Sequence, residues 1–122
     1  MITGRRNTWW ICIGIIAATA GCAYKKDVVE APCTIPATVT YTAQVQPVLS
    51  ANCYTCHSAA SNVSGILLDS YAALKVYALN GQLYGAIAHL PGIRPMPDSG
   101  GQLDACTIAT IKAWIDNGTP EN

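Results

Sequence analysis

The residue types in this 122-residue chain that are best suited to chemistry stand together in Cys53-Tyr54-Thr55-Cys56-His57. The pattern Cys-x-x-Cys-His is typical of a site at which haem is attached covalently. Two thiols spaced in this way share one helical turn, so each can add to one vinyl group of the same porphyrin. The adjacent imidazole can then ligate the iron. The pattern therefore predicts one covalent haem c, attached through Cys53 and Cys56 with His57 as an axial ligand, and chemistry that belongs to the iron.

Two other kinds of site use the same cysteine spacing. A thioredoxin-like redox site expects strands alternating with a helix around its cysteines, and the sequence has no such alternation. A zinc site would need a fourth ligand beside the motif, but the remaining candidates, Cys33 and Cys106, each stand alone. The adjacent histidine therefore favours haem over both alternatives.

The second axial position of the iron has two candidate ligands. Met96 is the only methionine apart from Met1, and it stands in Arg94-Pro95-Met96-Pro97. Prolines on both sides would present the thioether at a fixed point, whereas methionines that fill a core usually lie on an apolar helix face. His89 is the only other histidine, and bis-histidine ligation is chemically sound. We expect Met96 to be the sixth ligand, with His89 as the alternative.

The N-terminal residues have the order of an export signal. Arg5 and Arg6 precede a short apolar run over residues 9–20, which is shorter than the roughly 20 apolar residues that a spanning helix needs. Thr19-Ala20-Gly21-Cys22 resembles a bacterial lipobox, and this resemblance implies that Cys22 is lipidated and becomes the new N-terminus. The alternative is an uncleaved signal-anchor. We expect an exported protein on the periplasmic side or in the cell envelope, tethered to the membrane by lipid.

The remaining chain is long enough for one domain. We divide it into a lipoprotein-type signal peptide (1–21), a lipid-anchored tether with an extended arm (22–40) and a monohaem domain (41–122). From Cys22 onward seven acidic residues outnumber five basic ones, so the mature chain is slightly acidic. No basic stripe is present, which argues against nucleic acid as a partner.

Cysteine use predicts one disulfide. Four of the six cysteines have an expected fate in the leader, in lipidation or in haem attachment (Cys12, Cys22, Cys53, Cys56). Cys33 and Cys106 are left over as an even remainder in an oxidising compartment. We expect these two to form a disulfide that ties the arm to the last helix, and two unrelated free cysteines remain the alternative.

The hydrophobic pattern predicts an all-α domain with four helices. The first is expected from Thr42 or Ala43 to residue 52 with Thr42 as its N-cap, although Pro47 suits only a first turn. The second is expected over 71–79 after Asp69 or Ser70, and the third over 83–89. The last follows a cap at Asp104 and ends at Gly118. No alternating strand-like run occurs in the sequence.

Three motifs in this order resemble a class I c-type cytochrome: Cys53 to His57, Arg94 to Pro97, and Ile111-Lys112-Ala113-Trp114-Ile115-Asp116-Asn117-Gly118. The resemblance covers residues 40–120. It implies a small helical domain around the haem, with the first and last helices crossing near it. It further implies haem packing for Trp114 and a loop-shaping role for Pro95 or Pro97. The family usually has a proline after the haem motif whose carbonyl orients the proximal histidine, and residues 58–65 contain none.

Histidine–methionine ligation leaves no open position on the iron and raises its reduction potential. We therefore expect an electron carrier and not an enzyme, with transient redox-protein partners and no small-molecule substrate. One alternative is a haem-based sensor or binder of small ligands, which needs a labile sixth ligand. Another is the haem subunit of a larger oxidoreductase complex. Peroxidase-like catalysis would need a placed acid–base group, and His89 has no evident partner for that role.

Overall fold

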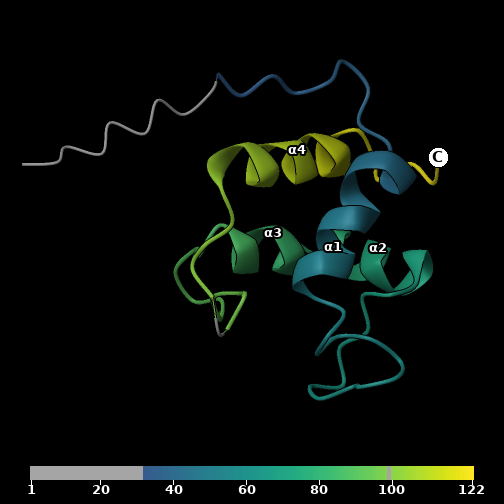
Figure 1. Ribbon diagram of the computed structural model, residues 1–122, viewed down its shortest axis with the longest axis vertical. Coiled ribbons are helices and arrows are strands. Elements are labelled where there is room, and N and C mark those ends of the chain that lie inside the picture. The colour runs from purple at the N-terminus through teal and green to yellow at the C-terminus, as the bar shows by residue number, and fades with distance from the viewer. Residues whose placement is uncertain (1–31, 99) are drawn as a thin grey trace, which may run out of the picture.

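The computed structural model describes residues 32–98 and 100–122. Within these ranges the chain is helical and has no β-strand, as the sequence predicts (Figure 1). One turn of π-helix, η1, is followed by four α-helices: η1 (Tyr41–Val45), α1 (Gln46–Asn52), α2 (Tyr71–Leu79), α3 (Gln82–Ile87) and α4 (Ala105–Asp116). None of these helices is long and apolar enough to cross a membrane. The expected signal peptide, the lipidation site Cys22 and the first part of the tether lie outside the described residues.

The first helix begins earlier than expected, because Thr40 and not Thr42 is its N-cap. The Thr40 hydroxyl accepts a hydrogen bond from the Ala43 N–H at 3.2 Å. The turn that follows is a π turn, in which the Gln46 N–H reaches the Tyr41 carbonyl. This wider turn places Pro47 in the first turn of α1, where its missing N–H costs no intrahelical bond.

Asn122, near the C-terminal end of the domain, accepts hydrogen bonds from residues at the start of this helix. The Thr42 N–H and hydroxyl both donate to the Asn122 carbonyl, at 3.0 and 2.8 Å. The Tyr41 N–H donates to the Asn122 side chain at 3.0 Å. These bonds use N–H groups that have no partner within the helix itself. Thr42 therefore joins the two ends of the domain instead of capping the helix.

The core forms where η1 packs against α4. Trp114 of α4 is fully buried, and its ring centroid lies 6.0 Å from that of Tyr41. Tyr41 also meets Tyr71, the first residue of α2, edge to face at 5.4 Å. The buried apolar residues form one cluster: Val39, Tyr41, Val45, Leu49, Leu68, Leu74, Ala78, Leu83, Ile87, Ile111 and Trp114. This cluster links all the helices around one core.

Helices α2 and α4 have the predicted bounds. Ser70 caps α2 by accepting a hydrogen bond from the Ala73 N–H, and Asp104 caps α4 in the same way through Thr107. Gly118 follows α4 with a φ of +85°, the left-handed geometry that favours glycine at this position. Helix α3 differs from expectation, because it ends at Ile87 and His89 lies beyond it in a left-handed conformation.

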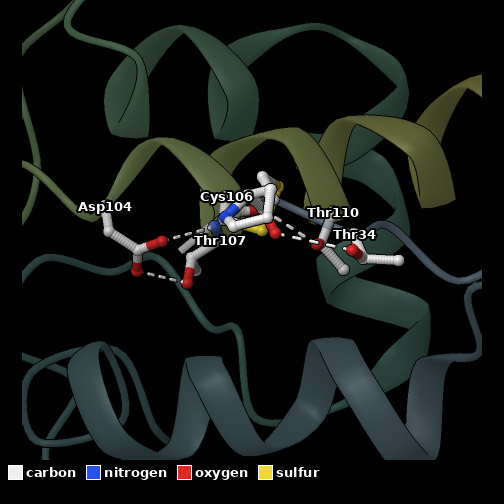
Figure 2. Close-up of a disulfide and its surroundings, with 7 residues drawn as sticks. Thr34, Asp104, Cys106, Thr107 and Thr110 are labelled. Atoms are coloured by element: carbon white, nitrogen blue, oxygen red, sulfur yellow. Dashed lines mark hydrogen bonds between the residues drawn. A yellow bond between two sulfur atoms is a disulfide. The ribbon is translucent and has the colours of Figure 1, made fainter. Parts of the chain in front are cut away.

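The predicted Cys33–Cys106 disulfide is present (Figure 2). Its Cα atoms are 5.3 Å apart, within the usual range for such bonds. The bridge ties the exposed arm that precedes η1 to the first turn of α4, next to the hydrogen bonds of Asp104 (Figure 2). A disulfide is consistent with a location outside the cytoplasm.

Candidate functional site

A cavity of about 420 Å³ lies beside the end of α1, with α2, α3 and the loop after α3 contributing to its wall. Its volume falls in the range of roughly 300–1,000 Å³ that is typical of cofactor and ligand sites. Most of the wall is apolar, and it includes Ile66, Leu68, Leu83, Ile87 and Ile93. Three of the residues singled out in the sequence, Cys53, His57 and Met96, also line it.

His57 is held in this wall by its side chain. It is only 9% exposed, and its Nδ1 lies 2.9 Å from the Ser64 hydroxyl and 3.2 Å from the Ile66 carbonyl. With the ring proton on Nδ1, both oxygens accept from it and Nε2 keeps a free lone pair, as a metal ligand requires. A backbone hydrogen bond also joins the two ends of the loop that follows His57, because the Leu68 N–H donates to the His57 carbonyl at 2.8 Å.

These contacts supply the orienting carbonyl for which the sequence has no proline. Ile66 provides it through its backbone, and Ser64 adds a hydroxyl from the same loop. Sequence reasoning missed both residues. No side-chain type signals a backbone acceptor, because every residue carries a carbonyl.

The two cysteines of the motif lie on the turn that follows α1. The N–H groups of Cys56 and His57 both donate to the Cys53 carbonyl, at 3.1 and 2.9 Å. Cys53 is partly buried in the cavity wall, and burial raises the pKa of its thiol to about 11. At neutral pH the Cys53 thiol therefore keeps its proton. Cys56 is exposed and is not among the cavity-lining residues.

The two candidates for the sixth ligand are placed differently. Met96 is partly buried and lines the cavity, whereas His89 is exposed and is not part of its wall. The His89 Nε2 instead lies 3.1 Å from the Met96 carbonyl oxygen. The Met96 N–H donates to the Ala86 carbonyl at 3.0 Å, which holds the methionine loop against α3.

A glycine allows this loop to pack closely. Gly85 is buried in α3, and a Cβ at this position would overlap the side chain of Ile93 in the loop. Pro95 and Pro97 flank Met96 without lining the cavity. Trp114 does not line it either, and its indole N–H donates to the Pro120 carbonyl at 3.0 Å. Trp114, Pro95 and Pro97 are the residues expected to pack at the haem, with Pro95 or Pro97 shaping the methionine loop, and these roles stay predictions.

The donors that face the cavity suit haem iron. An imidazole and a thioether are the axial pair found in electron-transfer cytochromes. Across residues 32–98 and 100–122, no three His, Cys, Asp or Glu side chains come together in a group that could hold a metal ion. An apolar cavity, a thiol in its wall, a histidine with a free Nε2 and a thioether together fit a covalent haem c.

Comparisons of the chain with models of known protein families, with curated protein sequences and with solved structures find no match. The function is therefore inferred from the residues and from the cavity that they form.

Proposed function

We propose that this protein is a monohaem c-type cytochrome that transfers electrons outside the cytoplasm. The observation that carries the proposal is the apolar cavity whose wall contains Cys53, His57 and Met96. These residues come from the turn after α1 and from the loop after α3, which are far apart in the sequence. Cys53 and His57 of the Cys-x-x-Cys-His pattern thus share one apolar cavity with Met96, which supports the proposal.

Each residue has a role that follows from its place. Cys53 and Cys56 would form the thioether bonds to the cofactor, while His57 and Met96 would provide the two axial ligands. The bound haem c supplies one-electron chemistry between Fe(III) and Fe(II). The apolar wall offers a nonpolar surface to the porphyrin, and the contacts of His57 hold its imidazole in one orientation. If His57 and Met96 both bind the iron, no position would be left on it for a substrate, so we do not expect an enzyme.

The setting of the protein follows from the same proposal. The Cys33–Cys106 disulfide suits an oxidising compartment, and the leader and Cys22 would deliver and tether the chain there. The redox partners are expected to be proteins that dock briefly, since electron-transfer encounters use small interfaces. No nucleic acid and no small-molecule substrate are expected.

The proposal is tested by producing the full chain in a host that matures c-type cytochromes. We expect haem that stays attached after denaturation and that is oxidised and reduced reversibly. Cys53→Ser should remove one of the two covalent bonds, which the absorption spectrum of the reduced pyridine complex detects. The Cys33→Ser/Cys106→Ser double variant is the matched control, because it removes two sulfurs that do not line the cavity.

Two results would count against this function. A wild-type chain that acquires no covalent haem would overturn the proposal outright. A reduced wild-type protein that binds carbon monoxide readily would have an open sixth position, and it would point to a sensor or binder of small ligands instead.

A further inference from the structure

Helices α3 and α4 end in the same backbone motif with different residues at its key position. After α4, the Gly118 N–H donates to the Ile115 carbonyl and the Thr119 N–H to the Trp114 carbonyl, at 2.9 and 3.0 Å. This pair of bonds is the Schellman motif, which requires a left-handed residue just past the helix. Glycine is the residue that takes up this geometry at least cost, and Gly118 does so with a φ of +85°.

The end of α3 repeats these bonds around a histidine. The His89 N–H lies 3.4 Å from the Ala86 carbonyl, and the Leu90 N–H donates to the Gly85 carbonyl at 2.9 Å. His89 occupies the glycine position with a φ of +55°. A side chain is disfavoured in this region of backbone space. The histidine therefore sits where the backbone alone would select glycine.

The imidazole of His89 makes a contact that glycine could not make. Its Nε2 lies 3.1 Å from the Met96 carbonyl, and with the proton on Nε2 the ring donates to that oxygen. The Met96 N–H meanwhile donates to the carbonyl of Ala86, in the same last turn of α3. Both polar groups of the Met96 backbone are thus held by the end of one helix. The Arg94–Asp98 ion pair on this loop is well exposed, and exposed pairs hold a loop only weakly.

We propose that His89 is a positioning residue, which fastens the Met96 loop so that the thioether stays at the cavity. The inference rests on the proposed function, because only a Met96 that binds iron requires its loop to be held in place. His89 then supports Met96 as a ligand instead of competing with it. The left-handed backbone and the contact with the loop occur at the same residue, so the contact can offset the cost of the strained conformation.

The variant His89→Gly separates the two effects of this residue. Glycine relieves the cost of a side chain in the left-handed region, and this offsets the lost contact, so we expect the free energy of unfolding of the full chain to stay about the same. The restraint on Met96 is lost at the same time. Hydrogen exchange of the Met96 amide should become faster by about fivefold, the factor that one neutral hydrogen bond supplies. In the haem-loaded protein, the near-infrared band of sulfur ligation should weaken and carbon monoxide should bind faster.

Two further variants serve as controls. Asn62→Gly places glycine at another positive φ, of +37°, in an exposed loop position and should leave the Met96 amide and the near-infrared band unchanged. His89→Gln keeps an N–H donor at the same number of bonds from Cα as the histidine Nε2, so it should restore part of the slow exchange.

The possible results separate this inference from the proposed function. An unchanged Met96 amide in His89→Gly would overturn the inference even if haem is bound. Faster exchange throughout the chain, with reduced stability, would make His89 an ordinary structural residue and would also overturn it. A wild-type chain without covalent haem would defeat the proposed function, while the exchange of the Met96 amide would still report on the contact with His89.

Discussion

The two segments of the cavity wall that carry the proposed iron ligands are held in place in different ways. His57 is held through its side chain, because Nδ1 lies between the Ser64 hydroxyl and the Ile66 carbonyl. Met96 is held through its backbone, whose N–H and carbonyl both contact the end of α3. The difference follows from the donor chemistry. An imidazole has a second nitrogen that can form hydrogen bonds while the first binds metal. A thioether has one weakly accepting sulfur and no second polar atom.

Removing each ligand should have the largest effect and should expose this difference. We expect His57→Ala to abolish the yield of stable holoprotein, because it removes the proposed iron ligand together with the contacts of a buried imidazole. Met96→Ala should keep covalent haem but open one axial position. The measurements are the haem content after denaturation and the binding of carbon monoxide by the reduced protein. Retention of the near-infrared band in Met96→Ala, with its loss in His89→Ala, would reverse the assignment of the sixth ligand.

Removing the disulfide should lower the free energy of unfolding of the whole domain without displacing His57 or Met96. Cys33 and Cys106 are separated by 73 positions in the sequence, and the chain-entropy model assigns about 4 kcal/mol to closing a loop of this length. We expect the Cys33→Ala/Cys106→Ala variant to lose stability of this order in urea unfolding. Neither cysteine contacts the cavity, so the near-infrared band of the folded protein should stay unchanged. A loss of the band would show that the arm helps to hold one of the ligands.

Removing the hydroxyl of Ser64 should alter the histidine side alone. Ser64→Ala leaves the Ile66 carbonyl as the one remaining contact of Nδ1, at a cost of about 1 kcal/mol in the free energy of unfolding. A ring N–H with fewer acceptors makes a less basic ligand, which favours Fe(II), so the reduction potential should rise. Voltammetry of the holoprotein measures this shift.

Ser61→Ala is the matched control for this prediction. Its hydroxyl lies in the same loop but contacts Ser58 and the Tyr54 carbonyl instead of His57. Equal potentials for the Ser64 and Ser61 variants would contradict the role of Ser64.

The smallest effect concerns pH and the far end of the methionine segment, where α4 begins. Hydrogen bonds from the Thr107 side chain and backbone lower the pKa of the Asp104 carboxyl (Figure 2). Because the folded pKa is the lower one, the stabilisation by ionised Asp104 is complete above its unfolded pKa. It is lost as the pH falls through the folded pKa.

Asp104→Asn keeps a capping side chain but cannot ionise, so it should flatten the dependence of stability on pH in the acidic range. Thermal melts across that range measure the slope. Glu121→Gln removes an exposed carboxylate elsewhere and should not give the same flattening. An unchanged slope in Asp104→Asn would contradict the prediction. The Met96 amide should be unaffected, since its contacts lie at the opposite end of the loop, on α3.

Local signals explain which parts of the fold could be predicted. The bounds of α2 and α4 follow from Ser70, Asp104 and Gly118, each of which acts on its immediate neighbours in the chain. The start of the first helix was predicted wrongly at Thr42. Its partner there is Asn122, at the other end of the domain, and no local pattern reveals such a contact.

The same distinction applies to the candidate site. The type and spacing of Cys53, Cys56 and His57 predict a cofactor because attachment uses neighbouring residues on one turn. His89 was an alternative ligand in the sequence, since a histidine's type does not say where its ring points. In the structure His89 has a left-handed backbone, and its ring lies at the Met96 carbonyl.

The sequence by itself determined the helical class and the pairing of the two leftover cysteines, and the structure confirms both. The Cys-x-x-Cys-His pattern is also a property of the sequence alone, and the haem attachment that it indicates stays a prediction. These depend on residue type and on short-range spacing, which a linear chain carries directly. Only the tertiary structure decided that Met96 lines the cavity with His57, and that Ile66 and Ser64 anchor the histidine. Those contacts join loops through backbone carbonyls and left-handed turns. They exist only after the helices have packed, and no residue type encodes them.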